Sequence, residues 1–210
     1  MADTRQRILD VARELFNTEG LGRVGIREIA RAVGISVGNL AYHFPTRDDL
    51  VATLVMELSD ENQRTIFGAL PEDFSFETLY RAATAAMRNM LRFRFVLLSY
   101  VEAVRASAHL ARLEKGMSVQ RRRRHDQMLA ALVAGGYVKR IAPERGDRLY
   151  EQGAMISSGW LTSATLRGLS DEAAVRHFAK LGCALLEPHC TPRGGRQMRR
   201  LLAGDYDRRR

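Results

Sequence analysis

Residues 26–47, IREIARAVGISVGNLAYHFPTR, predict two short helices joined by a tight turn. In the first half of this stretch, apolar residues recur at steps of three and four, which gives one buried helical face. Gly34 stands where the chain reverses, because glycine adopts a positive φ without steric cost. Ser36 can cap the second helix, since its hydroxyl accepts a hydrogen bond from an otherwise unpaired amide. Two helices joined by a glycine-containing turn predict a helix-turn-helix, whose second helix fits the major groove of DNA.

The second helix, over residues 37–43, is short and mostly exposed. Leu40 and Phe44 are four residues apart and share its buried side, so the other side chains point outwards. Asn39 can both donate to and accept from an adenine edge, and Tyr42 can bond a phosphate or stack on a sugar. The alternative is that these are ordinary solvated surface residues.

Three stretches together resemble the N-terminal domain of TetR-type transcriptional regulators: TRQRILDVARELF, the EG that follows shortly after it, and IREIARAVGISVGNLAYHFPTRDDL. The resemblance covers residues 4–58, about a quarter of the chain, and includes the turn glycine and the Pro-Thr-Arg after the second helix. A small three-helix packing unit that reuses the pattern is the alternative. The sequence departs from the family at Val24 and Gly25, which replace hydroxyl residues that would contact a phosphate. Arg23 or Arg27 could replace that contact.

The resemblance also implies which residues contact DNA. His43 and Arg47 are expected to bind phosphates, while Val37 and Ala41 are expected to contact thymine methyl groups. Gly38 lets the backbone approach the groove. The full expected set of DNA-binding residues is Arg27, Ser36, Val37, Gly38, Asn39, Ala41, Tyr42, His43 and Arg47.

Length and composition favour a helical fold. The chain has 210 residues, 46% of them hydrophobic, and only five prolines. Runs of alternating β-branched residues are absent from the sequence, so little or no sheet is expected. We predict an all-α protein: an N-terminal three-helix helix-turn-helix head and a C-terminal helical body for ligand binding and dimerisation. The expected domains are residues 1–46, the DNA-binding head, residues 47–192, the body, and residues 193–210, a basic tail with few apolar residues that is expected to be disordered.

The net charge of +9 is unevenly distributed along the chain. Residues 1–58 hold seven Arg against eight Asp and Glu, whereas residues 193–210 hold seven Arg and two Asp. Residues 121–124 are four consecutive arginines, which surround a helix because neighbours are about 100° apart. At least one of them is expected to turn towards the body, where it would form an ion pair or extend its charged end to the surface. Composition alone does not identify the DNA-binding face, so a helical architectural protein that binds DNA through its basic tail without sequence specificity is an alternative.

The family resemblance, rather than any motif, implies a pocket for a small-molecule effector in the body. The expected lining residues are Met87, Met90, Phe95, Leu98, Glu102, Met128, Tyr150, Met155 and Trp160. Methionines and aromatics at helical spacing are alternatively plain core. Glu102 lies in an otherwise apolar segment, and a buried carboxylate needs a partner. We favour an ion pair with Arg105 or with one of residues 121–124 over a contact with a cationic or hydroxylated ligand.

A helix-turn-helix protein that reads two half-sites is expected to be a homodimer. The last two long helices of the body combine small residues with apolar area, which suits close helix packing. The expected interface residues are Ser157, Trp160, Ala164, Phe178, Leu181, Gly182 and Leu185. Packing of the same faces within one chain is the alternative.

Other classes of function find little support in the sequence. The charged start of the chain does not predict a signal peptide, and no apolar stretch reaches the length of a membrane span. Cys183 and Cys190 lack disulfide-framework or zinc spacing, which favours a reducing cytoplasm, and we expect no metal and no other cofactor. A sensor built on these cysteines and His189 is a minor alternative. No nucleophile elbow or paired carboxylates indicate catalysis.

The sequence therefore predicts a TetR-like homodimeric transcriptional regulator in the cytoplasm. The favoured function is a repressor that binds a palindromic double-stranded DNA operator and is released by an unknown small-molecule effector. An enzyme that keeps a remnant head is a further alternative, but no credible set of catalytic residues supports it.

Overall fold

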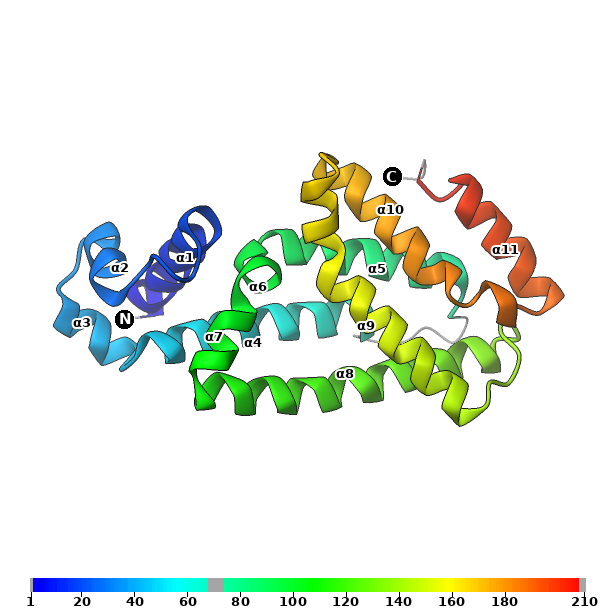
Figure 1. The fold of residues 1–210 in the computed structure, drawn as a ribbon, viewed down its shortest axis with the longest axis horizontal. Helices are drawn as coiled ribbons and strands as arrows, with labels where there is room; N and C mark the ends of the chain where they lie inside the picture. Colours follow the sequence, from blue (N-terminus) through cyan, green and yellow to red (C-terminus); the bar gives the residue numbers. More distant parts are fainter. Residues whose placement is uncertain (1, 68–73, 208–210) are drawn as a thin grey trace. The chain divides into compact units, whose positions relative to one another are not determined.

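The computed structural model describes residues 2–67 and 74–207, which are helical almost throughout (Figure 1). The helices in chain order are α1 (Ala2–Glu19), α2 (Ile26–Val33), α3 (Val37–His43), α4 (Arg47–Phe67), α5 (Phe76–Leu91), α6 (Arg94–Leu98), α7 (Tyr100–Ala106), α8 (Ala108–Ala134), α9 (Pro143–Leu166), α10 (Asp171–Ala184), the 3-10 turn η1 (Glu187–His189) and α11 (Pro192–Ala203). No strand occurs in the described ranges, and Val138 and Cys190 form an isolated antiparallel bridge. The all-α prediction is confirmed.

The chain divides into two compact units, each built from two separate segments. The first unit comprises Met1–Glu61 and Arg92–Met117, and the second comprises Asn62–Leu91 and Ser118–Arg210. Helices α4 and α8 each contribute to both units. This division differs from the boundaries at residues 46 and 192 that the sequence suggests, because α6 packs against α1 and groups with the head.

Aliphatic and aromatic side chains form the core of the first unit. Ile8 and Phe16 of α1, Ile29 of α2 and Leu40 of α3 are all buried. The ring of Phe16 lies 5.4 Å from the ring of Phe95 in α6. This contact fastens α6 to the same helix that supports α2, so the helix-turn-helix and α6 share one core.

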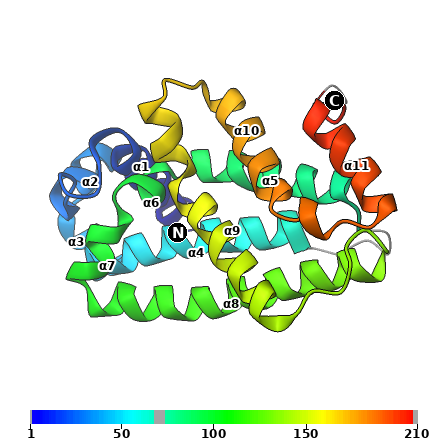
Figure 2. The ribbon, with the colours of Figure 1, turned by 45° about the vertical axis from the view of Figure 1, so that its right-hand side comes forward.

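Helix α10 is central to the second unit. It packs against α5, α9 and α11, and Figure 2 shows it crossing α5. Trp160 of α9 is fully buried, with its ring 6.3 Å from that of Phe178 in α10. On the surface, Arg88 of α5 makes a bidentate ion pair with Glu172 of α10, with both N···O distances at 2.9 Å.

The prediction of a disordered tail from residue 193 is wrong for its described part, because residues 192–203 form α11. The hydroxyl of Thr191 caps this helix by accepting from the Gly194 N–H at 3.1 Å, and Gly204, at φ +90°, ends it. Met198 and Leu201 are buried against the body. The seven arginines of residues 193–210 led to the prediction of disorder, although the segment also contains a short apolar face with regular helical spacing. Residues 208–210 lie outside the described part of the chain.

A polar cluster fastens the segment after α11. The hydroxyl of Tyr80 in α5 donates to the carboxylate of Asp207, and Lys180 in α10 donates to the same carboxylate at 2.6 Å. Burial, followed by the hydrogen bond to Asp207, raises the pKa of Tyr80 well above its usual range. Burial opposes ionisation of Asp207, but the bonds from Lys180 and Tyr80 outweigh it and lower the pKa of this carboxyl. The cluster therefore joins three distant parts of the sequence.

Gly194 provides a test of how α11 docks. A Cβ at this position would lie 1.9 Å from the carbonyl oxygen of Tyr137, whereas a Cβ on Gly195 meets nothing nearer than 3.7 Å. We predict that Gly194→Ala destabilises the protein by about 1–3 kcal/mol, as overpacking does, because the opposing atom is backbone and cannot move aside cheaply. Gly195→Ala is the matched control and should be neutral or stabilising. Chemical unfolding followed by circular dichroism measures both, and equal midpoints would contradict the docking described here.

Candidate nucleic-acid interface

The turn between α2 and α3 has the geometry that the sequence predicts. Gly34 has φ +77°, and its N–H donates to the carbonyl oxygens of Ala30 and Arg31 at 3.0 and 3.2 Å. The hydroxyl of Ser36 accepts from the Asn39 N–H at 3.1 Å and so caps α3. The expected roles of Gly34 and Ser36 are confirmed, and they set the direction in which α3 leaves the turn.

Helix α3 buries one side and exposes the other. Leu40 and Phe44 are 0% and 2% exposed, whereas Tyr42 is 77% exposed. Asn39 and the other outward residues of α3 are exposed as well, except the half-buried His43, whose ring lies edge-on to that of Tyr42 at 5.2 Å. A short helix with this exposed face has the shape of a major-groove reader.

The start of α4 is capped reciprocally. The Asp49 N–H donates to the Thr46 hydroxyl, and the Thr46 N–H donates to the Asp49 carboxylate, both at 3.1 Å. This arrangement fixes the first turn of α4 directly after α3. The amide groups of that first turn then form a positively polarised helix end.

The guanidinium of Arg47 makes hydrogen bonds within the protein, whereas the sequence predicts a phosphate contact. Its Nε donates to the carbonyl oxygen of Val24 at 2.8 Å, and a terminal nitrogen donates to the carbonyl oxygen of Leu21. The same group lies 5.6 Å from the centre of the Phe16 ring. Arg47 therefore joins α4 to the α1–α2 loop.

Among the other arginines of the first unit, some make hydrogen bonds within the protein and others lie on the surface. Arg7 donates to the carbonyl oxygen of Val33 at 2.8 Å, and so links α1 to the end of α2. Arg23, Arg27 and Arg31 are exposed. The sequence predicts Arg27 at the interface but does not point to Arg31. Arg31 follows Arg27 by four residues, so both lie on one side of α2, and this spacing is the signal that identifies Arg31.

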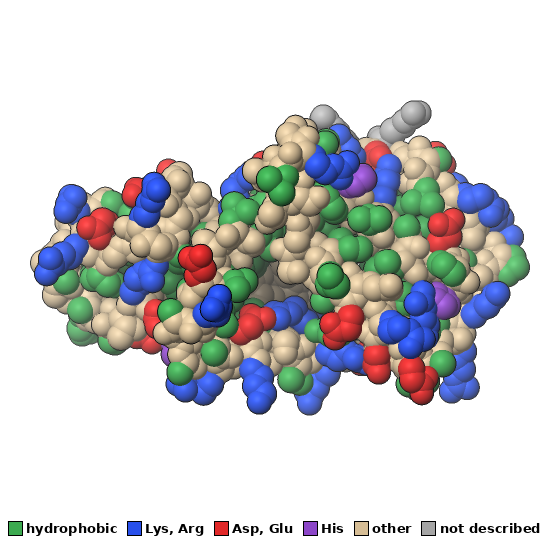
Figure 3. Space-filling view, in the orientation of Figure 1, with side chains coloured by type: hydrophobic (Ala, Val, Ile, Leu, Met, Phe, Trp, Pro, Cys, Tyr) green, Lys and Arg blue, Asp and Glu red, His purple; other side chains and the backbone are tan. Residues whose placement is uncertain are grey.

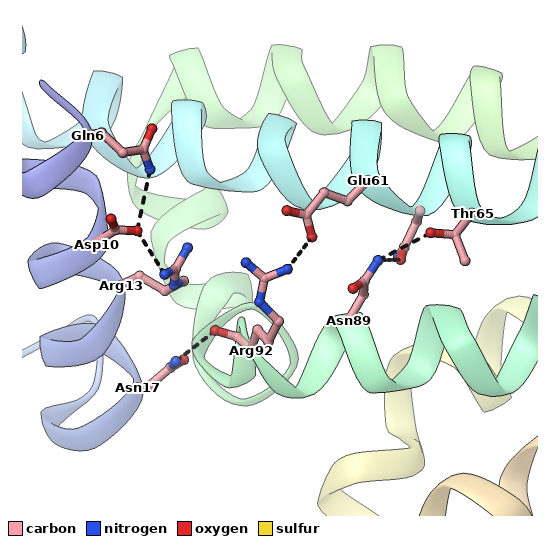
Figure 4. Close-up of polar contacts among 9 residues, drawn as sticks. Gln6, Asp10, Arg13, Asn17, Glu61, Thr65, Asn89 and Arg92 are labelled. Carbon is pink, nitrogen blue, oxygen red and sulfur yellow. Dashed lines mark hydrogen bonds and ion pairs between the residues drawn. The ribbon is translucent and has the colours of Figure 1, made fainter. Parts of the chain in front are cut away.

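Asn17 joins α1 to the segment that leads into α6, a contact that nothing in the sequence indicates. Its amide nitrogen donates to the carbonyl oxygen of Arg92 at 2.8 Å, and its amide oxygen accepts from the Phe95 N–H at 3.1 Å. Figure 4 shows Asn17 facing Arg92, whose guanidinium pairs with Glu61 of α4 at 2.7 Å. A single side chain thus holds two backbone groups of the α6 end to the head helix.

Comparison with known proteins identifies the family. The model described as "Bacterial regulatory proteins, tetR family" matches residues 8–54, and the TetR model described as "Bacterial transcriptional repressor" matches residues 61–198. The second match alone covers more than half of the chain. This protein belongs to the TetR family. The family resemblance predicted from residues 4–58 is therefore confirmed.

Relatives and solved structures agree with this assignment. The chain is 42% identical over 60 residues to the HTH-type transcriptional regulator AcrR of Shigella flexneri, covering 29% of this chain and 27% of that protein. It is 29% identical over 104 residues to the HTH-type transcriptional regulator SAB2452 of Staphylococcus aureus (strain bovine RF122 / ET3-1), covering 48% and 55%. The matches thus span about a quarter and about half of these two relatives. A TetR-family regulator from Marinobacter aquaeolei VT8 has the same fold, with a TM-score of 0.81 at 18% identity over 96% of this chain and 98% of that one.

The expected effector-binding residues of this TetR-family protein have different environments. Met87, Phe95 and Trp160 are buried, and Met90, Met128 and Tyr150 are half-buried. Leu98 and Met155 are 51% and 73% exposed and do not line an enclosed space within their own units. Phe95, Leu98 and Glu102 belong to the first unit and the other six to the second.

The expectation for Glu102 is wrong, because this carboxylate is exposed rather than buried. In the described part of the chain it forms no ion pair with Arg105 or with residues 121–124. Exposure removes the need for a partner. The expectation that one of the four arginines pairs is correct: Arg122 forms ion pairs with Asp126, at 3.1 Å, and with Asp147.

Several residues expected at a dimer interface lie inside the protein instead. Trp160, Ala164 and Phe178 are buried where α9 meets α10. Ser157, Gly182 and Leu185 are half-buried, and Leu181 is 43% exposed. The alternative of packing within one chain therefore holds for the three buried residues, since each helix has one face for the core and another for the surface.

The described residues contain no cluster of three or more His, Cys, Asp or Glu side chains suited to a metal ion. Cys183 is fully buried, and burial raises the pKa of its thiol to about 12. A thiol of this kind stays protonated at neutral pH, which makes it a poor metal ligand or nucleophile. None of the described helices is long and apolar enough to cross a membrane.

The contacts of Arg47 predict how its loss would act. Arg47→Ala removes a charged donor from two backbone carbonyl groups, which typically costs about 1.5–3 kcal/mol per bond to a charged group. We expect reduced unfolding free energy in urea, with weaker DNA binding as a consequence. Arg27→Ala is the control, because Arg27 is exposed and its loss should leave stability unchanged. A variant at Arg47 with normal stability and weakened DNA binding would instead identify it as a DNA contact.

Proposed function

We propose that this TetR-family regulator is a homodimeric repressor of a palindromic operator, released from DNA by a small-molecule effector in the second unit. The single observation that carries the proposal is the exposed face of α3, held on a capped and buried frame. Repression is supported by the description of the family model that matches residues 61–198. We place the protein in the cytoplasm, where its DNA would be, and propose neither a cofactor nor an enzymatic activity.

We assign the recognition of DNA bases to α3. Asn39 and Tyr42 reach outwards from the helix, and Asn is suited to paired hydrogen bonds with adenine. Val37 and Ala41 offer apolar contacts, and Ser36, Gly38 and His43 complete the assigned set.

Phosphate binding is assigned to two neighbouring features. Arg27 and Arg31 are exposed on α2, and the N-terminal end of α4 follows α3 directly in the chain. The Arg47 backbone is part of that helix end, while its side chain supports the frame. These contacts would position α3 without reading sequence.

Dimerisation is assigned to the outer face of α9 with its neighbour α10. Met155, Gly159, Thr162 and Leu166 recur at steps of three and four on α9 and are all exposed. Met155 and Leu166 are 73% and 84% exposed, which is unusual for large apolar side chains outside an interface. Of the residues that the sequence predicts at the interface, the 43% exposed Leu181 and the half-buried Ser157, Gly182 and Leu185 remain assigned to this surface.

The effector is assigned to the interior of the second unit, around Trp160. Its indole Nε1 is buried and has no hydrogen-bond acceptor among the described residues. An unpaired buried donor costs about 1–3 kcal/mol, so an effector that offers an acceptor there would bind favourably. Met87, Met90, Met128 and Tyr150 remain candidates for its apolar contacts.

Release requires a connection between effector and head. The Asn17 contacts hold the α6 end to α1, so a shift of α6 would move or strain the helix that supports α2 and α3. The effector would then favour a state whose heads no longer fit two half-sites.

The first experiment tests sequence reading. We expect Asn39→Ala and Tyr42→Ala to lower affinity for DNA from the protein's own upstream region by about 1–3 kcal/mol each, with no change in thermal stability. Fluorescence anisotropy against a scrambled duplex at physiological salt measures this, and Glu19→Gln, an exposed position in α1, is the control. Equal affinity for both duplexes, unaffected by either change, would refute the regulator proposed here.

A second experiment tests the dimer. Met155→Glu combined with Leu166→Glu should convert the protein to a monomer and reduce operator affinity, because charge would be placed in an apolar interface. Sedimentation velocity reports the oligomeric state. Val101→Glu is a suitable control, since Val101 is 70% exposed on α7. An unaltered dimer in the double variant would locate the interface elsewhere.

A further inference from the structure

Helix α11 has an apolar face docked on the body and a cationic face directed to solvent. Gly194, Met198 and Leu201 are buried, at steps of four and three. Arg193, Arg196 and Arg200 follow the helix at steps of three and four on its other side, and Arg199 lies beside them. The helix itself contains no acidic residue. The arginines on the other side of α11 therefore remain exposed when its apolar face is buried against the body.

The loop before α9 extends this cationic surface. The Lys139 N–H donates to the His189 carbonyl oxygen at 2.9 Å, and the guanidinium of Arg193 lies 4.3 Å from the centre of the Tyr137 ring. These contacts place Lys139 and Arg140 next to the start of α11. We call the set the α11 basic surface: Lys139, Arg140, Arg193, Arg196, Arg199 and Arg200. Figure 3 shows Lys and Arg side chains along the edge where α11 lies.

Some of these cations are already engaged and others are available. Arg193 donates to Tyr137 and Gly135, and Arg200 forms an ion pair with Asp205 at 3.3 Å. In the described ranges no ion pair or side-chain hydrogen bond involves Lys139, Arg140, Arg196 or Arg199, and all four are exposed. Arg193 and Arg200 make contacts near the two ends of α11, and the exposed side chains of Arg196 and Arg199 lie between them.

The charge of the whole protein is concentrated in this unit. The second unit contains 21 Lys and Arg against 12 Asp and Glu, whereas the first contains 12 of each. The unit with the helix-turn-helix is therefore neutral, and the entire net charge of +9 belongs to the other one. A unit with this excess of positive charge attracts polyanions such as nucleic acids.

We propose that the α11 basic surface binds the phosphate backbone of duplex DNA without sequence specificity, as a second DNA contact separate from α3. Arginine supplies five of its six cations, and guanidinium groups pair with phosphate oxygens bidentately. A membrane partner is disfavoured because the apolar face of α11 is occupied by the body. A regulator with this surface holds additional DNA beyond the half-sites, which raises its residence near the operator.

The test compares variants on a duplex that lacks the operator. Arg196→Ala with Arg199→Ala should reduce the affinity severalfold and reduce the slope of log K against log salt by about 1.8, or 0.9 for each lost phosphate contact. Fluorescence anisotropy between about 50 and 200 mM salt measures the slope. Arg112→Ala with Arg123→Ala is the matched control: these are two exposed arginines of α8, and the change in net charge is the same. Its slope should stay near that of the wild type.

Separate outcomes distinguish this proposal from the repressor proposal. The Asn39→Ala, Tyr42→Ala double variant should lose preference for the operator but keep the non-specific affinity supplied by α11. Circular dichroism should show equal melting for all variants, because every altered side chain is exposed. The proposal is overturned if the α11 variant keeps the wild-type slope, or if the α8 control loses as much, which would reveal an effect of net charge alone.

Discussion

The contact of the Arg47 guanidinium with two carbonyl groups and the Phe16 ring is the constraint on which the first unit depends. It joins the start of α4, the α1–α2 loop and the core of the head at one point. Helix α3 lies between α2 and α4 in the sequence, so its position is set at both ends: by the Gly34 turn before it and by the Thr46–Asp49 cap and Arg47 after it. A helix of seven residues has little intrinsic stability, and this frame supplies what it lacks.

The same first unit also holds α6 against the head helix α1. Phe95 packs on Phe16, and Asn17 satisfies two backbone groups beside it. Phe16 is therefore shared by the Arg47 contact and the α6 contact. The contacts that hold α3 and the contacts that hold α6 meet on one aromatic ring.

The second unit separates packing from charge. Its core is formed by α10 against α5, α9 and α11, with Trp160 and Phe178 inside. The surface carries all of the net charge, and α11 displays both features in one helix. This separation explains why net charge did not point to α3 as the candidate DNA-reading helix: α3 lies in the neutral unit, whereas the excess of positive charge lies in the other unit.

The sequence by itself determined the helix-turn-helix and the family. Gly34, Ser36, Leu40 and Phe44 act through local backbone geometry and helical spacing, which short-range reasoning captures. It did not determine the role of Arg47 or Asn17, because their partners lie 23–26 and 75–78 residues away. It also misjudged the tail after residue 192, and it assigned the buried Trp160 and Phe178 to a dimer interface. Apolar spacing shows that a helix has a packing face, but only the tertiary structure decides which neighbour covers that face, and the four arginines of α11 drew attention away from the small face that the body buries.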